Sequence, residues 1–330
     1  MSPSRFWGAL ALSAAVLVII AIVAPLIGSA HVDYGRAWAG ISPDHEILFY
    51  VRLPRVLLAL IAGGTLAVTG VLFQAILREP LAEPFTLGIS SGSSLGAVLA
   101  ICFGWNTVFG APATWVAAFT GAAATLVLVL TIAFERRRVS SFTLLLAGVS
   151  INSISMATIL FLHNVATFSQ SFAITRWLMG GLDALEYRVL AGLGAVILPV
   201  IFLVFWRARD WNLLAVGEEW ASSRGVHATR MLVAGYIAGS LMTGSVTAFT
   251  GPIGFIGLIV PHGLRILFGA DHRVLVPCSF LLGASFLIVC DTVARTVLSP
   301  TEVPVGVITA MLGGPFFIWL LRSKRRSLWL

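Results

Sequence analysis

The sequence predicts an all-α polytopic membrane protein with about ten transmembrane helices. Hydrophobic residues make up 58% of the 330-residue chain and charged residues only 11%, whereas a soluble globular domain carries roughly 25% charged residues. A soluble fold of this size could not bury so much apolar surface, so lipid must solvate most of it. A spanning helix needs about 20 apolar residues, and the runs that approach this length are 8–28, 54–77, 91–106, 113–134, 142–165, 189–206, 230–249, 254–268, 275–296 and 304–321.

The first run, 8–28, follows the positively charged Arg5, as the apolar part of a signal peptide would. It is longer than that part usually is, and further runs follow it, so we expect a retained first transmembrane helix. The third and eighth runs, 91–106 and 254–268, are short and glycine-rich, which leaves the count open by one or two. Because nothing else in the sequence resembles a soluble domain, we treat 1–330 as a single transmembrane domain.

The lysine and arginine residues predict the orientation, because cytoplasmic loops carry an excess of both. Ten spans place both termini on the same side. If that side is the cytoplasm, 15 of the 21 Lys and Arg residues lie on the inner side, and the six outer ones are Arg36, Arg52, Arg55, Arg176, Arg188 and Arg295. We therefore expect a multi-pass protein of the cell inner (plasma) membrane with both termini cytoplasmic. The net charge of +7 follows mainly from the inner loops and requires no nucleic-acid partner.

Several function classes are disfavoured by the motifs that the sequence lacks. It contains no Walker A or HExxH pattern and no pair of catalytic carboxylates, so neither ATP hydrolysis nor another enzymatic reaction is expected of this chain. The three cysteines lie in apolar runs without metal-binding spacing, and we predict no metal site. An ion-coupled carrier usually has an ionisable residue at mid-membrane, whereas Asp291, Arg295 and Glu302 cluster at a predicted outer helix end. A transport subunit without its own energy source fits better.

Four segments share their order and spacing with a known family. They are RLPR at 52–55, REPLAEPFTLGISSGSSLGA at 78–97, GPIGFIGLIVPHGLR at 251–265 and DTVARTVLSPTEVPVGVITAMLGGPFFIWLL at 291–321. Together they resemble the permease family of bacterial ABC importers for iron chelates and vitamin B12, and the resemblance covers nearly the whole chain. Glu79 stands where the family usually has Asn.

The resemblance implies a homodimer or close heterodimer with the transport pathway along the dimer interface. Two cytoplasmic ATPase subunits, which bind ATP and Mg²⁺, would drive transport, and a periplasmic substrate-binding protein would deliver the cargo. No cofactor is expected to stay bound. Haem, ferric siderophores and cobalamin share this architecture. Arg176 beside Trp177 could meet a carboxylate of haem or of a siderophore, or could anchor the chain among headgroups, and it inclines us towards an anionic iron chelate.

Three arginines run against the positive-inside trend at the outer ends of predicted helices: Arg52, Arg55 and Arg295. Family members use arginines at matching positions to grip glutamates of the binding protein, and the resemblance implies this docking role here. A guanidinium group can hold a carboxylate in a bidentate, charge-assisted pair. The alternative is that these side chains snorkel to lipid headgroups.

The segment 213–230, LLAVGEEWASSRGVHATR, is amphipathic and lies between the sixth and seventh runs. Two glycines punctuate it, which predicts two short helices with a turn. It resembles the family's coupling segment, which would contact the ATPase through a short apolar edge; the alternative is an interfacial helix among headgroups. The residues assigned to coupling are Leu213, Leu214, Gly217, Glu218, Glu219, Trp220, Arg224 and Gly225.

Polar side chains in the fifth run predict a pathway wall, because a polar group inside a membrane usually faces protein or water; bonding between helices is the alternative. Related permeases place an inner gate where this run begins, although Phe142 stands where some have a small polar residue. The residues assigned to the pathway and gate are Ser140, Ser141, Phe142, Asn152, Ser155 and Arg176. We expect 251–265 to form a turn and a short helix that ends near the cytoplasmic surface with His262 and Arg265.

Overall fold

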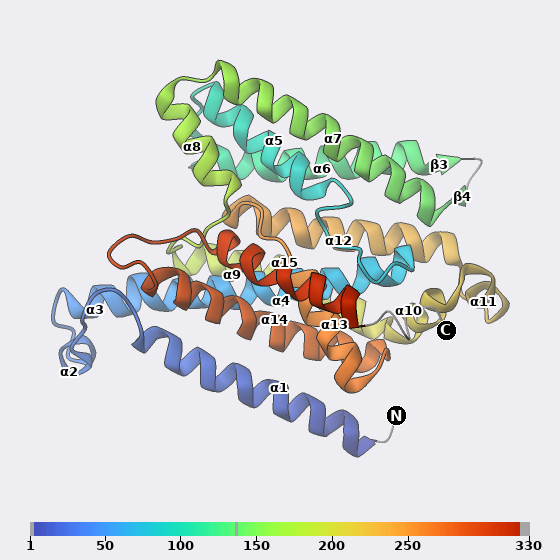
Figure 1. Ribbon diagram of the computed structural model, residues 1–330, viewed down its shortest axis with the longest axis horizontal. Helices are drawn as coiled ribbons and strands as arrows, with labels where there is room; N and C mark the ends of the chain where they lie inside the picture. The colour runs from blue at the N-terminus through green and yellow to red at the C-terminus, as the bar shows by residue number, and fades with distance from the viewer. Residues whose placement is uncertain (1–2, 136–137, 324–330) are drawn as a thin grey trace.

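The protein is built from apolar helices that run along its longest axis (Figure 1). The computed structural model describes residues 3–135 and 138–323. Within these residues, seven helices are long and apolar enough to cross a membrane, and three shorter apolar helices accompany them. These coincide with the ten predicted runs, so the predicted fold class is confirmed. Arg136, Arg137 and the basic residues after Ser323, which entered the orientation argument, lie outside the described residues.

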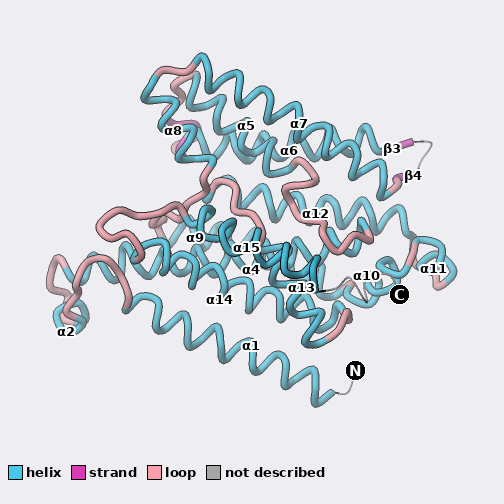
Figure 2. The backbone as a smooth tube through the Cα atoms, in the orientation of Figure 1, coloured by secondary structure: helices cyan, strands magenta, loops and turns pink. Residues whose placement is uncertain are grey.

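Helices account for most of the chain (Figure 2). The long ones are α1 (Pro3–Val23), α4 (Leu53–Leu77), α6 (Ala113–Ala133), α7 (Ser141–Val165), α9 (Tyr187–Trp206), α12 (Ala228–Thr250) and α14 (His272–Thr296). The shorter ones are α2 (Tyr34–Trp38), α3 (Asp44–Glu46), a π-helical turn (Ile47–Arg52), α5 (Ile89–Cys102), α8 (Phe168–Leu178), α10 (Ala208–Val216), α11 (Glu218–Ser223), α13 (Ile256–Phe268) and α15 (Val305–Ser323). Two small antiparallel hairpins pair β1 (Thr107–Val108) with β2 (Ala111–Pro112) and β3 (Phe134–Glu135) with β4 (Arg138–Val139).

Helix α4 is the centre of the core. In its most apolar stretch 83% of the residues are buried, against 28% in the corresponding stretches of α1, α6, α7 and α9. A helix that is apolar all round and buried all round belongs to the interior. The peripheral helices are equally apolar but expose most of their side chains, which fits a surface that lipid covers.

The other helices form layers around α4. Helices α14, α12 and α13 pack directly on it, and α1 packs on the far side of α14. Helices α5, α6 and α7 form a second layer that meets α4 mainly through α12 (Figure 1). The first run is therefore an integral helix, since Ala9, Ser13 and Leu17 of α1 are buried in the same core as α14.

The two ends of the bundle carry different polar groups. We call the end where α4 begins the Arg55 end; α2, α3 and α8 also lie there (Figure 1). We call the opposite end, which carries α10, α11 and the β3–β4 hairpin, the Glu218 end. The start of α1 and the last described turn of α15 both lie at the Glu218 end, as an even number of crossings requires.

Close backbone contact joins α13 to α4. A Cβ atom at Gly70 would lie 2.0 Å from the carbonyl oxygen of Gly257, which is far inside the contact distance of those atoms. Glycine therefore lets the two backbones touch, in the way that small residues do in membrane bundles. This contact fixes the short α13 against the central helix.

We predict that Gly70→Ala lowers the free energy of unfolding by about 1–3 kcal/mol, because the added methyl group must push two backbones apart. Thermal unfolding of the purified protein in detergent, followed by tryptophan fluorescence, measures the effect. The matched control is Gly263→Ala in α13, where a Cβ would meet no atom within 4 Å. Equal melting temperatures for the two variants would contradict the prediction.

Candidate functional site

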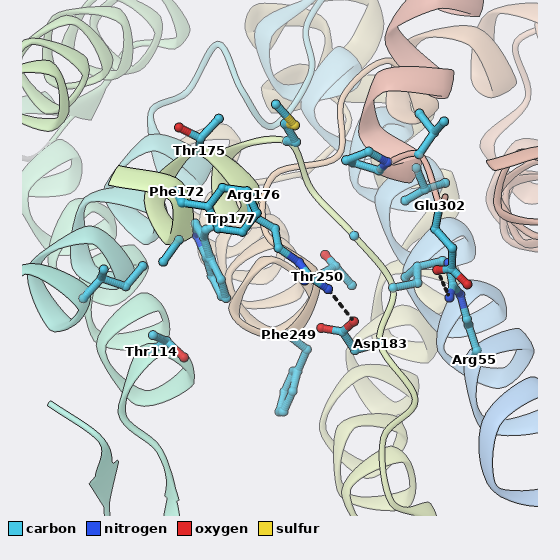
Figure 3. A pocket seen from close by; sticks show the side chains of 18 residues that line it. Arg55, Thr114, Phe172, Thr175, Arg176, Trp177, Asp183, Phe249, Thr250 and Glu302 are labelled. Atoms are coloured by element: carbon cyan, nitrogen blue, oxygen red, sulfur yellow. Dashed lines mark hydrogen bonds and ion pairs between the residues drawn. The ribbon is translucent and has the colours of Figure 1, made fainter. Parts of the chain in front are cut away.

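A cavity of about 710 Å³, whose lining is mostly apolar but includes four charged side chains, opens at the Arg55 end, where the end of α8, the end of α12 and the loop before α15 meet. Figure 3 shows Arg176 and Asp183 facing each other inside it, with Arg55 and Glu302 along one side. The guanidinium of Arg176 lies 3.8 Å from the carboxylate of Asp183. We call this space the polar cavity.

The ion pair in the polar cavity is weak. The Arg176 and Asp183 side chains are 73% and 80% exposed, and solvent screens such a pair to about 0–1 kcal/mol. The pair therefore does not hold the fold together, and another anion can replace Asp183 beside Arg176. Three aromatic side chains, Phe172, Trp177 and Phe249, also line the cavity.

Backbone hydrogen bonds join three segments of the chain beside the polar cavity. The Gly181 amide donates to Thr250 O at 2.8 Å, and the Gly306 amide donates to Gly180 O at 3.3 Å. Gly180 has a φ of +69°, and a Cβ there would lie 2.3 Å from the carbonyl oxygen of Pro252. Only glycine tolerates both conditions, so the residues after α8, the residues after α12 and the start of α15 converge at this point.

Beside the polar cavity lies a buried network of charges. Arg55 Nε donates to Asp291 Oδ1 at 2.9 Å, and Arg55 Nη1 donates to Glu302 Oε2 at 2.7 Å. Arg295 Nε lies 3.0 Å from Asp291 Oδ2, one helical turn away. The Asp291 side chain is 1% exposed and that of Glu302 47% exposed. The network thus has a buried anion that two arginines neutralise and an outer anion that water reaches.

Arg52, Arg55 and Arg295 gather at one end, as predicted for docking, but none has a free guanidinium in this structure. All three are buried, Arg55 and Arg295 in the charge network. Arg52 donates to the backbone oxygens of Pro25 and Ala30, which fixes the chain after α1. Docking of the binding protein at these arginines stays a prediction, and it requires a carboxylate of the binding protein to replace one of these internal contacts. The sequence did not predict Glu302 as a partner of Arg55 or Asp183 as a partner of Arg176. Each carboxylate follows, within a few residues, a helix with an arginine in its last turn, and this pattern could have indicated them.

The predicted pathway residues on α7 divide into two groups. Ser140 caps the helix by accepting from the Phe142 amide, and the Phe142 side chain is exposed. Asn152 is partly exposed, but Ser155 is buried against neighbouring helices. Ser155 therefore does not line an open pathway wall in this structure; α7 packs against α5 and α6.

The predicted coupling segment folds into two short helices, as expected, with Gly217 between α10 and α11 and Gly225 after α11. The apolar residues that were predicted to form one docking edge do not all lie on the surface. Leu214 is fully buried in the bundle, so it anchors α10 and is not available for docking. Trp220 is exposed on α11, and the Arg224 guanidinium lies 5.3 Å from the centre of its ring. Leu213 packs against the core, while Glu219 is exposed.

The segment 251–265 forms a turn and then α13, as predicted. Glu83, from the loop between α4 and α5, accepts a hydrogen bond of 3.1 Å from the Phe255 amide at the start of α13. An anion at this position suits the positive end of a helix. Burial raises the pKa of Glu83 to about 7, although the Phe255 amide acts in the opposite direction. His262 is buried within α13, whose last turn, with Arg265, points to the Glu218 end.

Within residues 3–135 and 138–323, no group of three or more His, Cys, Asp or Glu side chains gathers that could hold a metal ion. Ten apolar helices with a polar cavity at one end and paired short helices at the other define the transmembrane subunit of a transporter. The chain belongs to the FecCD transport family, whose family model matches residues 15–323. It is a permease of the ABC importer type, and this family implies partner ATPase subunits and a substrate-binding protein.

Named relatives transport different cargoes. The chain is 36% identical to the hemin transport system permease protein HmuU of Yersinia pestis over 315 residues, covering 94% of each chain. It is also 36% identical to the vitamin B12 import system permease protein BtuC of Escherichia coli over 316 residues, again covering 94% of each. A solved structure described as a metal-chelate type ABC transporter in an inward-facing conformation matches with a TM-score of 0.82 and 31% identity, covering 96% of this chain and 99% of that one.

We predict that Asp291→Asn destabilises the protein by about 3–5 kcal/mol, because it leaves two buried arginines without their shared anion. The comparison variant is Glu302→Gln, which removes a carboxylate from the same network where water reaches it, and should cost no more than about 1 kcal/mol. Chemical unfolding in detergent measures both. Similar losses in the two variants would show that burial of Asp291 does not decide the effect.

Proposed function

We propose that this chain is the permease subunit of an importer that moves an anionic iron chelate, haem or a ferric siderophore, from the periplasm to the cytoplasm. The observation that carries the proposal is the polar cavity, where Arg176 is widely exposed between aromatic walls. A carboxylate of the cargo can replace Asp183 beside Arg176, because that pair is weak and screened. A flat ring system can lie against Trp177 and Phe249.

A second candidate cargo is cobalamin. The vitamin B12 permease BtuC is as similar to this chain as the hemin permease HmuU. The polar cavity carries no net formal charge in its lining, since Arg55 and Arg176 are matched by Asp183 and Glu302. A neutral cargo would therefore not be repelled, and the cargo experiment below separates the two candidates.

We place the Glu218 end in the cytoplasm and both termini with it, in the inner membrane. The basic side chains of the described residues support this orientation, because loops and helix ends at the Glu218 end are rich in arginine. They include Arg78, Arg207, Arg209, Arg224, Arg230, Arg265 and Arg273. The arginines at the Arg55 end that face other protein groups, Arg52, Arg55 and Arg295, are neutralised or bonded internally.

The proposed assembly has a second copy of the permease, two ATPase subunits at the Glu218 end and the binding protein at the Arg55 end. Docking of the binding protein requires a carboxylate to reach a guanidinium. Arg55 is suited to such an exchange, because its partner Glu302 is half exposed. Asp291 stays buried and keeps Arg55 in place during the exchange. Trp220 and Val216, exposed at the Glu218 end, offer the apolar contact for the ATPase.

We expect haem or a ferric siderophore, and not cobalamin, to stimulate ATP hydrolysis and uptake in proteoliposomes that contain the permease, its ATPase and the cognate binding protein. Arg176→Gln should lower uptake of the anionic cargo by about tenfold or more, since a hydrogen bond to a charged group contributes about 1.5–3 kcal/mol. The matched control is Arg188→Gln, an exposed arginine at the start of α9 that does not line the cavity. Stimulation by cobalamin alone, or equal uptake by both variants, would contradict the proposal.

Docking gives a separate prediction. Glu302→Gln should raise the affinity of the nanodisc-embedded permease for the binding protein by up to about fivefold, because a competitor worth about 1 kcal/mol no longer occupies Arg55. Surface-based binding measurements at low salt report the change. Glu186→Gln, an exposed carboxylate before α9 at the same end, serves as the control for net charge. Weaker binding, or the same change in both variants, would count against exchange at Arg55.

A further inference from the structure

At the Glu218 end, one carboxylate joins three segments. Glu218, the first residue of α11, places Oε1 at 3.2 Å from the hydroxyl of Ser141 and at 3.3 Å from Nη2 of Arg78. Ser141 is the first residue of α7, and Arg78 follows the last residue of α4. The proposed ATPase-contacting helix is thus in direct contact with the proposed gate helix.

The Ser141 hydroxyl has two acceptors but one proton. Its oxygen lies 2.8 Å from the carbonyl oxygen of Ile76 and 3.2 Å from Oε1 of Glu218. Ile76 lies in the last turn of α4, where carbonyl groups have no partner within the helix. A hydroxyl can donate to only one acceptor at a time. The start of α7 therefore has two alternative bonds, and the distance to Glu218 decides between them.

Helix α11 is held by fewer buried side chains than its neighbour α10. Trp211 and Leu214 bury α10 in the bundle, and the Asn212 amide donates to Asp271 Oδ1 at 2.9 Å. Beyond Gly217, where a Cβ would meet no atom within 4 Å, α11 buries Ala221. A partner that contacts exposed Trp220 would therefore act on the less firmly held of the two helices.

The contact of Glu218 is too exposed to hold the fold. The side chains of Arg78 and Glu218 are 42% and 33% exposed, and pairs of this kind contribute little to stability. Loss of the carboxylate should therefore leave the protein folded. The carboxylate instead influences the position of α7, because it offers the Ser141 hydroxyl an acceptor that belongs to α11.

We propose that Glu218 is a positioning residue that transmits movement of α11 to α7, by competing with the Ile76 carbonyl for the Ser141 hydroxyl. The inference rests on the proposed function, in which α11 contacts the ATPase and α7 carries the inner gate. When α11 approaches, the hydroxyl bonds to Glu218 and α7 follows α11. When α11 recedes, the hydroxyl returns to Ile76 and α7 stays with α4.

The test compares Glu218→Ala, Ser141→Ala and the double variant in proteoliposomes with the ATPase and the binding protein. Alanine is used because glutamine would keep an oxygen that can accept from Ser141. We expect Glu218→Ala to lower cargo imported per ATP hydrolysed by at least about fivefold, the lower range of typical coupling between sites, measured on complexes that contain the ATPase subunits. The double variant should be no worse than Glu218→Ala alone, because both changes remove the same contact. The matched control is Glu79→Ala, an exposed carboxylate next to Arg78, which should behave as wild type.

A second readout follows α7 itself. Phe142→Cys places a thiol on the exposed first turn of α7, and its alkylation rate should change on addition of ATP in the otherwise wild-type complex but not together with Glu218→Ala. Equal transport ratios in Glu218→Ala and Glu79→Ala, additive losses in the double variant, or an ATP response that survives Glu218→Ala would each overturn the inference. A wild-type complex without cargo-dependent uptake would instead overturn the proposed function, and the inference with it.

Discussion

The burial of Asp291 is the constraint on which the Arg55 end depends. A lone carboxylate inside a membrane protein carries a desolvation cost of several kcal/mol, and two arginines from α4 and α14 offset it. Arg55 then reaches Glu302, which brings the loop before α15 to the edge of the polar cavity. The same arginine therefore completes a buried pair and presents a half-exposed one. Arg55 therefore supports the fold through Asp291 and, in the proposed docking, offers its contact with Glu302 for exchange.

Helix α4 connects this end to the other. It begins beside the charge network and finishes at the carbonyl of Ile76 and at Arg78, which contact Ser141 of α7 and Glu218 of α11 respectively. Its middle is fixed by close backbone contact with α13 through Gly70. The partner exchanges that we propose at the two ends would therefore leave the packing of this helix unchanged. Inside the bilayer every backbone group must stay hydrogen-bonded, so a change of partner is easier at the ends of the helix than in its middle.

Apolar length was enough to predict the ten helices, because the solvent inside a membrane imposes it on every span. The two short helices around Gly217 were also visible, since glycine marks a break in an amphipathic pattern. The direction in which each side chain points could not be predicted. From the sequence alone, Leu214 was expected to contact a partner and Ser155 to line the pathway, yet both are buried against helices that lie far away in the sequence. The arginines at positions 52, 55 and 295 were correctly grouped, but their carbonyl and carboxylate partners depend on how α1, α14 and the loop before α15 converge.

The backbone junction beside the polar cavity has a consequence for how this protein can diversify. Its hydrogen bonds join peptide groups of three segments, so they do not depend on the side chains that these segments carry into the cavity. In the proposed function, cargo recognition rests on a few of those side chains, chiefly Arg176, Asp183 and Trp177. Exchange of these residues, one at a time, would change the recognition chemistry and leave the junction in place. Two relatives that are equally identical to this chain are named for cargoes as unlike as hemin and vitamin B12.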